Sequence, residues 1–159
     1  MLIGTSTQLR AADNISSIIV VGANLKPTAE LKSLGVILDS RLTFDAHVSA
    51  VSKACNYHLW ALRHIRHLLT LDLANTVACR IVGARLDYCN SLLYGAPTST
   101  VAILQRLQNS MAQVVLQQPR RTHVESLLRS LHWLPIKHRI NYKIAVLTYK
   151  VRATSTPHN

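Results

Sequence analysis

Apolar residues spaced by three and four positions run through residues 44–69 and constrain the fold more than any other feature. They are Val48, Val51, Cys55, Leu59, Leu62, Ile65 and Leu69. Residues at these spacings share one face of an α-helix, so we predict a helix from about Phe44 to Leu68. Thr43 is placed to cap this helix, and Asp45 falls in its first turn, where a carboxylate meets the positive end of the helix dipole.

The same reasoning predicts four more helices in the rest of the chain. One spans about Leu71 to Asn90, with Thr70 as its N-cap, and another spans Ser99 to about Gln117. A short helix begins at Thr122, which forms a capping-box pattern with Glu125. The last begins at Pro135, a favourable first helical position, and ends near Arg152.

Residues 1–42 show a different pattern, with short apolar runs between turn-forming residues. We predict strands at Met1–Gly4, Ser17–Gly22 and Leu34–Leu38, followed by a turn at Asp39. The predicted fold class is mainly α with a small N-terminal β portion (α+β). We expect three parts: a β segment at 1–42, a helical part at 43–118 and a basic helical segment at 119–159.

The distribution of charge is the main indication of function. The net charge is +11 and the pI is near 10.2. Residues 1–52 hold four basic and four acidic residues, whereas residues 53–159 hold fourteen basic and three acidic ones and account for the entire excess. Such an asymmetry indicates a polyanionic partner, with nucleic acid first and an anionic membrane second.

Several classes of protein are excluded by composition. Hydrophobic residues make up 48% of the chain, which is too many for a disordered tail. No apolar run approaches the roughly 20 residues of a membrane span, and the first ten residues lack the pattern of a secretory signal. Three widely spaced cysteines indicate reduced thiols. We therefore expect an intracellular protein of the nucleus or cytoplasm that is neither secreted nor membrane-bound.

A stripe of cations and rings lies opposite the apolar face of the first helix. Its members are Lys53, Tyr57, Trp60, His64 and His67. Lysine can neutralise phosphate while flat rings pack on sugars or exposed bases, so the stripe is a candidate nucleic-acid surface. The alternative is a solvated face whose aromatic residues are partly covered by a neighbour.

Two further groups of basic residues are candidates for phosphate contacts. Arg139 and Lys143 lie with Lys150 on one side of the last predicted helix, flanked by tyrosines. Arg120 and Arg121 lie in a predicted loop before the fourth helix. A plain solvated basic face explains the group on the last helix about equally well, and a single basic pair such as Arg120 and Arg121 is weak evidence for a phosphate contact.

The residues offer little for metal binding or covalent catalysis. Cys55 with His58, and His64 with His67, have a spacing that could share a metal, but a zinc site needs four ligands. Cys89 lies near Asp87 without a histidine nearby in sequence, and no glycine-rich phosphate loop occurs. We predict no metal site and no catalytic residue in this chain.

Four phrases in a fixed order identify a family that the chain resembles. They are ELKSLGVILDSRLTFDAHV, RLDYCNSLLYG, LQRLQNSMAQVV and LHWLPIKHRINYKIAVLTYK. Together they resemble the region after the catalytic motifs in reverse transcriptases of LINE-type (non-LTR) retrotransposons, especially the jockey-like group. The resemblance covers nearly the whole chain. One departure is Ala112-Gln113, where the family commonly has Ala-Arg.

The resemblance implies a fragment that holds nucleic acid rather than a complete polymerase. LGVILD corresponds to the primer-grip hairpin at the end of the palm, and the helical part corresponds to the thumb, which holds the template–primer duplex. The aromatic-Ala-Asp-Asp box that binds two magnesium ions in the family is absent and is expected upstream of Met1, and both ends look cut. We therefore expect binding to an RNA–DNA hybrid, the missing palm and fingers as partners, no cofactor in this chain and no polymerase activity in isolation. The alternatives are an independent nucleic-acid-binding or interaction module and a non-functional remnant.

Overall fold

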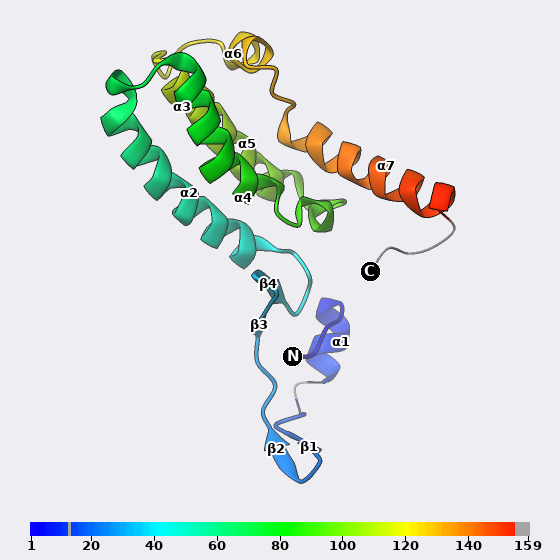
Figure 1. Ribbon diagram of the computed structural model, residues 1–159. Helices are drawn as coiled ribbons and strands as arrows, with labels where there is room; N and C mark the ends of the chain where they lie inside the picture. The colour runs from blue at the N-terminus through cyan, green and yellow to red at the C-terminus, as the bar shows by residue number, and fades with distance from the viewer. Residues whose placement is uncertain (13, 155–159) are drawn as a thin grey trace. The chain divides into compact units, whose positions relative to one another are not determined.

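The computed structural model describes residues 1–12 and 14–154, and its contacts divide the chain into two compact units, Met1–Ser49 and Ala50–Asn159. The first unit holds the strands and the second is helical (Figure 1), so the predicted class, mainly α with a small N-terminal β portion, is confirmed. The division falls inside the long helix α2 (Asp45–Ile65). The helices on both sides of residue 118 belong to the second unit.

Two hairpins make up the β portion. Strand β1 (Ile18–Val20) pairs antiparallel with β2 (Ala23–Leu25), and β3 (Glu30–Ser33) pairs antiparallel with β4 (Val36–Asp39). Each connection has two residues with positive φ, +49° and +78° in the first and +46° and +80° in the second. This is the geometry of a type I′ turn, whose twist matches that of the flanking strands. The strand predicted at 34–38 is β4, which begins at Val36 instead, because Leu34 and Gly35 form the turn.

The strand predicted at Met1–Gly4 is wrong. These residues are in no strand, and a short helix, α1 (Ser6–Ala11), follows them. The Thr5 hydroxyl accepts the Gln8 backbone N–H at 3.4 Å, and Gln8 Oε1 accepts the Thr5 N–H at 2.9 Å. This reciprocal capping box satisfies two backbone donors at the helix start, so local hydrogen bonding outweighs the short apolar run.

Asp39 organises the connection between β4 and α2, as its predicted turn position implied. Its Oδ2 accepts the N–H groups of Arg41 and Thr43 and the Thr43 hydroxyl at 3.1–3.2 Å, and its Oδ1 accepts the Phe44 N–H at 2.8 Å. The predicted capping role of Thr43 survives in part, because its hydroxyl accepts the Asp45 N–H at 3.4 Å. Asp45 lies in the first turn of α2, as predicted.

The helices of the second unit follow the predicted order with small shifts at their ends. α2 continues into a 3₁₀ turn, η1 (Arg66–Leu68), and Thr70 caps α3 (Leu71–Ala78) by accepting the Leu73 N–H at 3.3 Å. A π-helical segment, η2 (Cys79–Gly83), and α4 (Ala84–Asp87) continue the path of α3. The predicted helix to Asn90 stops at Asp87, because the left-handed conformation of Cys89 (φ +53°) starts a new 3₁₀ turn, η3 (Asn90–Leu93).

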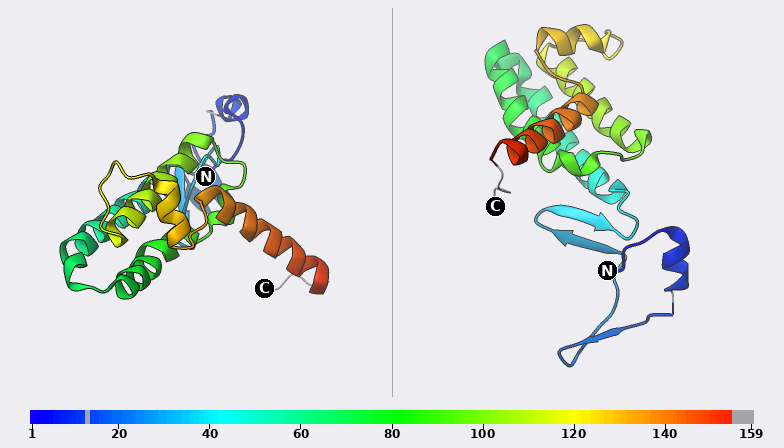
Figure 2. Two further views of the ribbon diagram at one scale, coloured as in Figure 1. Left: turned by 90° about the horizontal axis from the view of Figure 1, so that it is seen from above. Right: turned by 90° about the vertical axis from the view of Figure 1, so that its right-hand side faces the viewer.

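The core of this unit is centred on helix α5 (Thr98–Val115), which contacts α3, α6 (Val124–Ser130) and α7 (Ile136–Thr154). Met111, Ala112 and Val115 of α5 are completely buried. The apolar face of α2 contributes Cys55, Leu59 and Leu62. Figures 1 and 2 show the C-terminal half of α7 extending beyond the other helices of this unit, and Leu147, Tyr149 and Val151 there are exposed.

Two predicted helix starts differ from the structure. The capping box predicted at Thr122 and Glu125 is wrong: α6 begins at Val124 behind His123, without a side-chain cap. Glu125 instead forms an ion pair of 2.7 Å with Arg129, because residues four apart on a helix are neighbours. α7 begins one residue after Pro135, whose carbonyl accepts the Arg139 N–H.

Replacing Asp39 with asparagine is expected to destabilise the first unit by about 1 kcal/mol at pH 7, because an amide offers a single acceptor oxygen. Burial alone raises the pKa of Asp39, but the hydrogen bonds from Thr43, Phe44 and Arg41 outweigh it and hold this pKa below its ordinary value. The carboxylate's contribution is therefore fully present above about pH 4 and is lost as the pH falls through the lowered pKa.

Urea unfolding followed by far-UV circular dichroism at pH 7 and pH 3 tests this prediction. The difference between Asp39→Asn and the parent chain should shrink at pH 3. Glu30→Gln, which removes an exposed carboxylate from β3, is the matched control and should change little at either pH. A difference for Asp39→Asn that is the same at both pH values contradicts the role assigned to its charge.

Candidate nucleic-acid interface

The stripe of cations and rings lies on the exposed side of α2 and η1. Lys53, His64 and His67 are exposed, and Tyr57 and Trp60 keep 68% and 59% of their surface accessible. The opposite face of the helix is buried, with Cys55, Leu59 and Leu62 below 5% exposure. Helical periodicity therefore separates the two faces as the sequence predicted, and aromatic residues of the stripe remain available to flat ligands.

Two rings of this stripe are held in a fixed arrangement. The Trp60 and His64 ring centroids are 4.1 Å apart with an interplanar angle of 52°. His64 Nδ1 lies 2.9 Å from the Trp60 carbonyl oxygen. A carbonyl only accepts hydrogen bonds, so Nδ1 carries the proton, which leaves Nε2 pointing away from this contact. This bond limits rotation of the imidazole, and less side-chain entropy is then lost when a ligand packs on the pair.

A basic hollow lies where η1 meets the end of α5 and the following loop. We call it the arginine hollow; its volume is about 380 Å³. Its lining residues are Arg63, Arg66, His67, Gln113, Val114, Gln117, Gln118, Pro119 and Arg120. The hollow brings together His67 and Arg120, which the sequence assigned to separate groups, and its lining contains no acidic residue.

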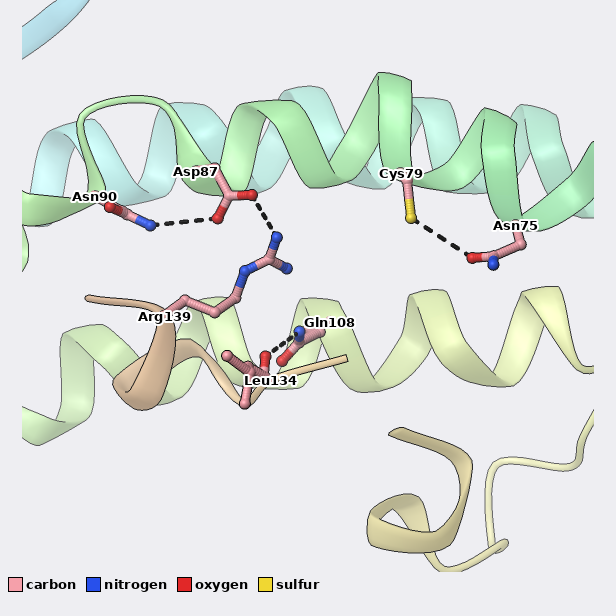
Figure 3. Close-up of polar contacts among 7 residues, drawn as sticks. All are labelled: Asn75, Cys79, Asp87, Asn90, Gln108, Leu134 and Arg139. Atoms are coloured by element: carbon pink, nitrogen blue, oxygen red, sulfur yellow. Dashed lines mark hydrogen bonds and ion pairs between the residues drawn. The ribbon is translucent and has the colours of Figure 1, made fainter. Parts of the chain in front are cut away.

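Arg139 is tied to an acid rather than free for phosphate. Its guanidinium forms an ion pair with the Asp87 carboxylate at the end of α4, and Asn90 Nδ2 donates to the other carboxylate oxygen at 3.2 Å (Figure 3). Asp87 thereby fixes the Asn90 amide, whose Oδ1 is buried without a partner in the described part of the chain. The pair attaches the start of α7 to the end of α4.

The remaining candidates are placed separately. Lys143 is exposed one turn beyond Arg139, and both line a second hollow of about 370 Å³ beside Trp133 and Tyr142. Arg121 is exposed and does not line the arginine hollow, although it adjoins Arg120 in sequence.

Arg66 is the important residue that the sequence analysis missed. It keeps only 9% of its surface accessible, whereas Ile65, which was assigned to the buried face, is 46% exposed. The signal was present in the spacing, since Cys55, Leu59, Leu62 and Arg66 continue the same steps of four and three. A charged residue at a buried position of such a stripe indicates a specific partner for its charge.

The possible reactive groups are dispersed. Among residues 1–12 and 14–154, no three His, Cys, Asp or Glu side chains come close enough to hold a metal ion. Burial raises the pKa of the Cys55 thiol to about 11, although Arg85 opposes this shift, so the thiol stays protonated near neutral pH. Asp39 is engaged by backbone donors, as described above, and Asp45 lies in the first turn of α2.

Within the part of the chain that the structure describes, no helix has both the length and the apolar character needed to cross a bilayer. Comparisons with known protein families, with characterised proteins and with solved structures found no match to this chain.

The Asp87–Arg139 pair is expected to stabilise the chain more than the Glu125–Arg129 pair. Its side chains are 42% and 23% exposed, against 72% and 79% in the other pair. Partial removal from water strengthens an ion pair that is also held by a further hydrogen bond. Double-mutant cycles with Asn and Gln replacements test this, with unfolding in urea followed by tryptophan fluorescence. The coupling energy between Asp87 and Arg139 should be about 1 kcal/mol. Glu125–Arg129 is the control and should give roughly 0.3 kcal/mol. Equal coupling energies would contradict this assignment.

Proposed function

We propose that this chain is a segment of a LINE-type reverse transcriptase and that it holds an RNA–DNA hybrid. The observation that carries the binding proposal is the exposed stripe of Lys53, Tyr57, Trp60, His64 and His67 on a unit that contains the entire positive excess. The ordered phrases quoted above support the assignment to this family.

The charge balance of the second unit supports a polyanionic partner. It contains fourteen basic residues and three acidic ones. Two of the acids, Asp87 and Glu125, are already paired with arginines, and Asp72 lies in the first turn of α3. Twelve basic residues are thus left without a carboxylate partner in the described structure, and a phosphate backbone supplies the anions that the protein lacks.

The arrangement favours contacts that do not read sequence. Lysine and arginine on helices and a loop meet phosphates, while exposed rings pack on sugars or bases of any type. In the intact polymerase, the palm and fingers would be the partners of this segment and would carry the two magnesium ions. This chain would position the duplex and would be inactive alone.

Lys53→Glu and Lys143→Glu are each expected to lower the affinity for the hybrid and to make that affinity less dependent on salt. Each variant should lower the slope of log affinity against log salt by roughly 1, because each lysine would neutralise one phosphate. The measurement is fluorescence anisotropy of the full chain with a short labelled RNA–DNA hybrid across a salt series. Lys26→Glu in the first unit makes the same charge change outside the interface and is the control. A folded chain that does not bind the hybrid would refute the proposal.

Removing the Trp60 ring is expected to act through stacking rather than charge. Trp60→Ala should weaken hybrid binding by about five- to a hundredfold, which corresponds to roughly 1–3 kcal/mol, and should leave the salt slope unchanged. Tyr94→Ala removes a similarly exposed ring outside the stripe, since Tyr94 is 64% exposed, and it should bind like the parent chain. A loss of affinity shared equally by both variants would contradict the role of the stripe.

A further inference from the structure

The arginine hollow contains a buried charge that the protein does not neutralise. Arg66 is nine-tenths buried; its Nε donates to the Val115 carbonyl at 2.7 Å and its Nη1 to the Leu69 carbonyl at 2.8 Å. Both acceptors are uncharged, and the ion pairs of the described residues involve Arg129 and Arg139 instead. Removing a guanidinium from water without a counterion costs free energy. A bound anion would offset this cost, so the position favours an anionic ligand.

The end of α5 offsets only part of that charge. Val115 is the last residue of α5, and its carbonyl belongs to the negative end of the helix dipole, which is equivalent to about half an elementary charge. Arg66 therefore also caps α5, and this contact fixes the orientation of its guanidinium. The Nη2 group has no hydrogen-bond partner in the described structure. The result is a preoriented donor with remaining positive charge at the wall of an open hollow.

The rest of the lining is suited to the same ligand. Arg63 and Arg120 add two exposed guanidinium groups, and His67 adds an exposed imidazole ring. The loop that carries Arg120 is attached to α5, because Gln113 Nε2 donates to the Arg120 carbonyl at 3.2 Å. The volume of about 380 Å³ lies within the usual range of ligand pockets, roughly 300–1,000 Å³.

We infer that the arginine hollow is a binding site for a phosphate group. Planar guanidinium forks match the oxygens of phosphate, and three arginines without an acid favour a ligand of high charge density. The phosphate can come from a nucleic-acid backbone, in which case the inference rests on the proposed function, or from free phosphate in solution.

Inorganic phosphate provides the first test, at constant ionic strength and pH 7 with the full chain. The Arg66 Nε–Hε resonance in a ¹H–¹⁵N spectrum should shift and saturate as phosphate is added. Arg63→Gln and Arg120→Gln alter exposed rim residues, and Arg120 keeps its backbone contact, so both variants should fold. Each variant should raise the phosphate concentration at the midpoint of this shift about fivefold. Arg106→Gln removes an exposed arginine of α5 outside the hollow and should leave the midpoint unchanged. No saturable shift, or the same midpoint in all variants, would overturn the inference.

Competition with the RNA–DNA hybrid separates the two sources of phosphate. If the backbone fills the hollow, the rim variants weaken hybrid binding and phosphate competes with the hybrid. If free phosphate is the ligand, the saturable shift persists while hybrid affinity is the same in Arg63→Gln, Arg120→Gln and Arg106→Gln. Hybrid binding without any phosphate shift would overturn this inference and leave the proposed function standing. A phosphate shift without hybrid binding would support the inference for free phosphate and refute the proposed function.

Discussion

A buried amide network between α5 and the start of α7 sets the course of the C-terminal helix. Gln108 is completely buried, and its Nε2 donates to the Leu134 carbonyl at 2.8 Å, a contact drawn in Figure 3. Its Oε1 accepts a hydrogen bond from Gln105, whose own Oε1 accepts the Ile136 N–H at 2.9 Å. The first turn of a helix leaves its N–H groups without partners inside the helix, so Gln105 replaces a cap that Pro135 does not provide.

The position of the basic residues on α7 follows from this network. With the start of α7 held against α5, Arg139 reaches Asp87 and Lys143 remains exposed one turn further on. Asp87 is one of three acids in the second unit, and its use in a structural ion pair removes one of the few groups that would repel an anion. In the second unit, the acids thus lie at helix starts or in ion pairs, while most of the cations face solvent. The contacts that hold the helices together therefore also leave the exposed surface positively charged.

Most of the helical part could be predicted from the sequence, because its apolar spacing is regular and Thr70 is a strong cap. Errors arose where a local pattern had competing explanations. The run at Met1–Gly4 was too short to distinguish a strand from a coil, whereas TSTQ at residues 5–8 already contained the capping box of α1. At residues 122–125 the same pattern failed, because Glu125 pairs with Arg129 instead. Arg66 continues the apolar spacing of α2, but its hydrogen bond to the Val115 carbonyl and the meeting of His67 with Arg120 are tertiary contacts, which single-sequence periodicity does not report.

The hairpins of the first unit bear on how far this chain can act alone. Every residue of β1, β2 and β3 is exposed, including Ile18, Ile19 and Leu31. Two-stranded hairpins are at best marginally stable in water, so these strands gain little from burial of their own side chains. Under the proposed function, the palm would cover this apolar surface and supply that stability. Adding the palm should then protect the backbone amides of β1–β3 from hydrogen exchange while leaving the core amides of α5, around Met111 and Val115, unaffected. Protection equal in the chain with and without the palm would show that the hairpins do not depend on that cover.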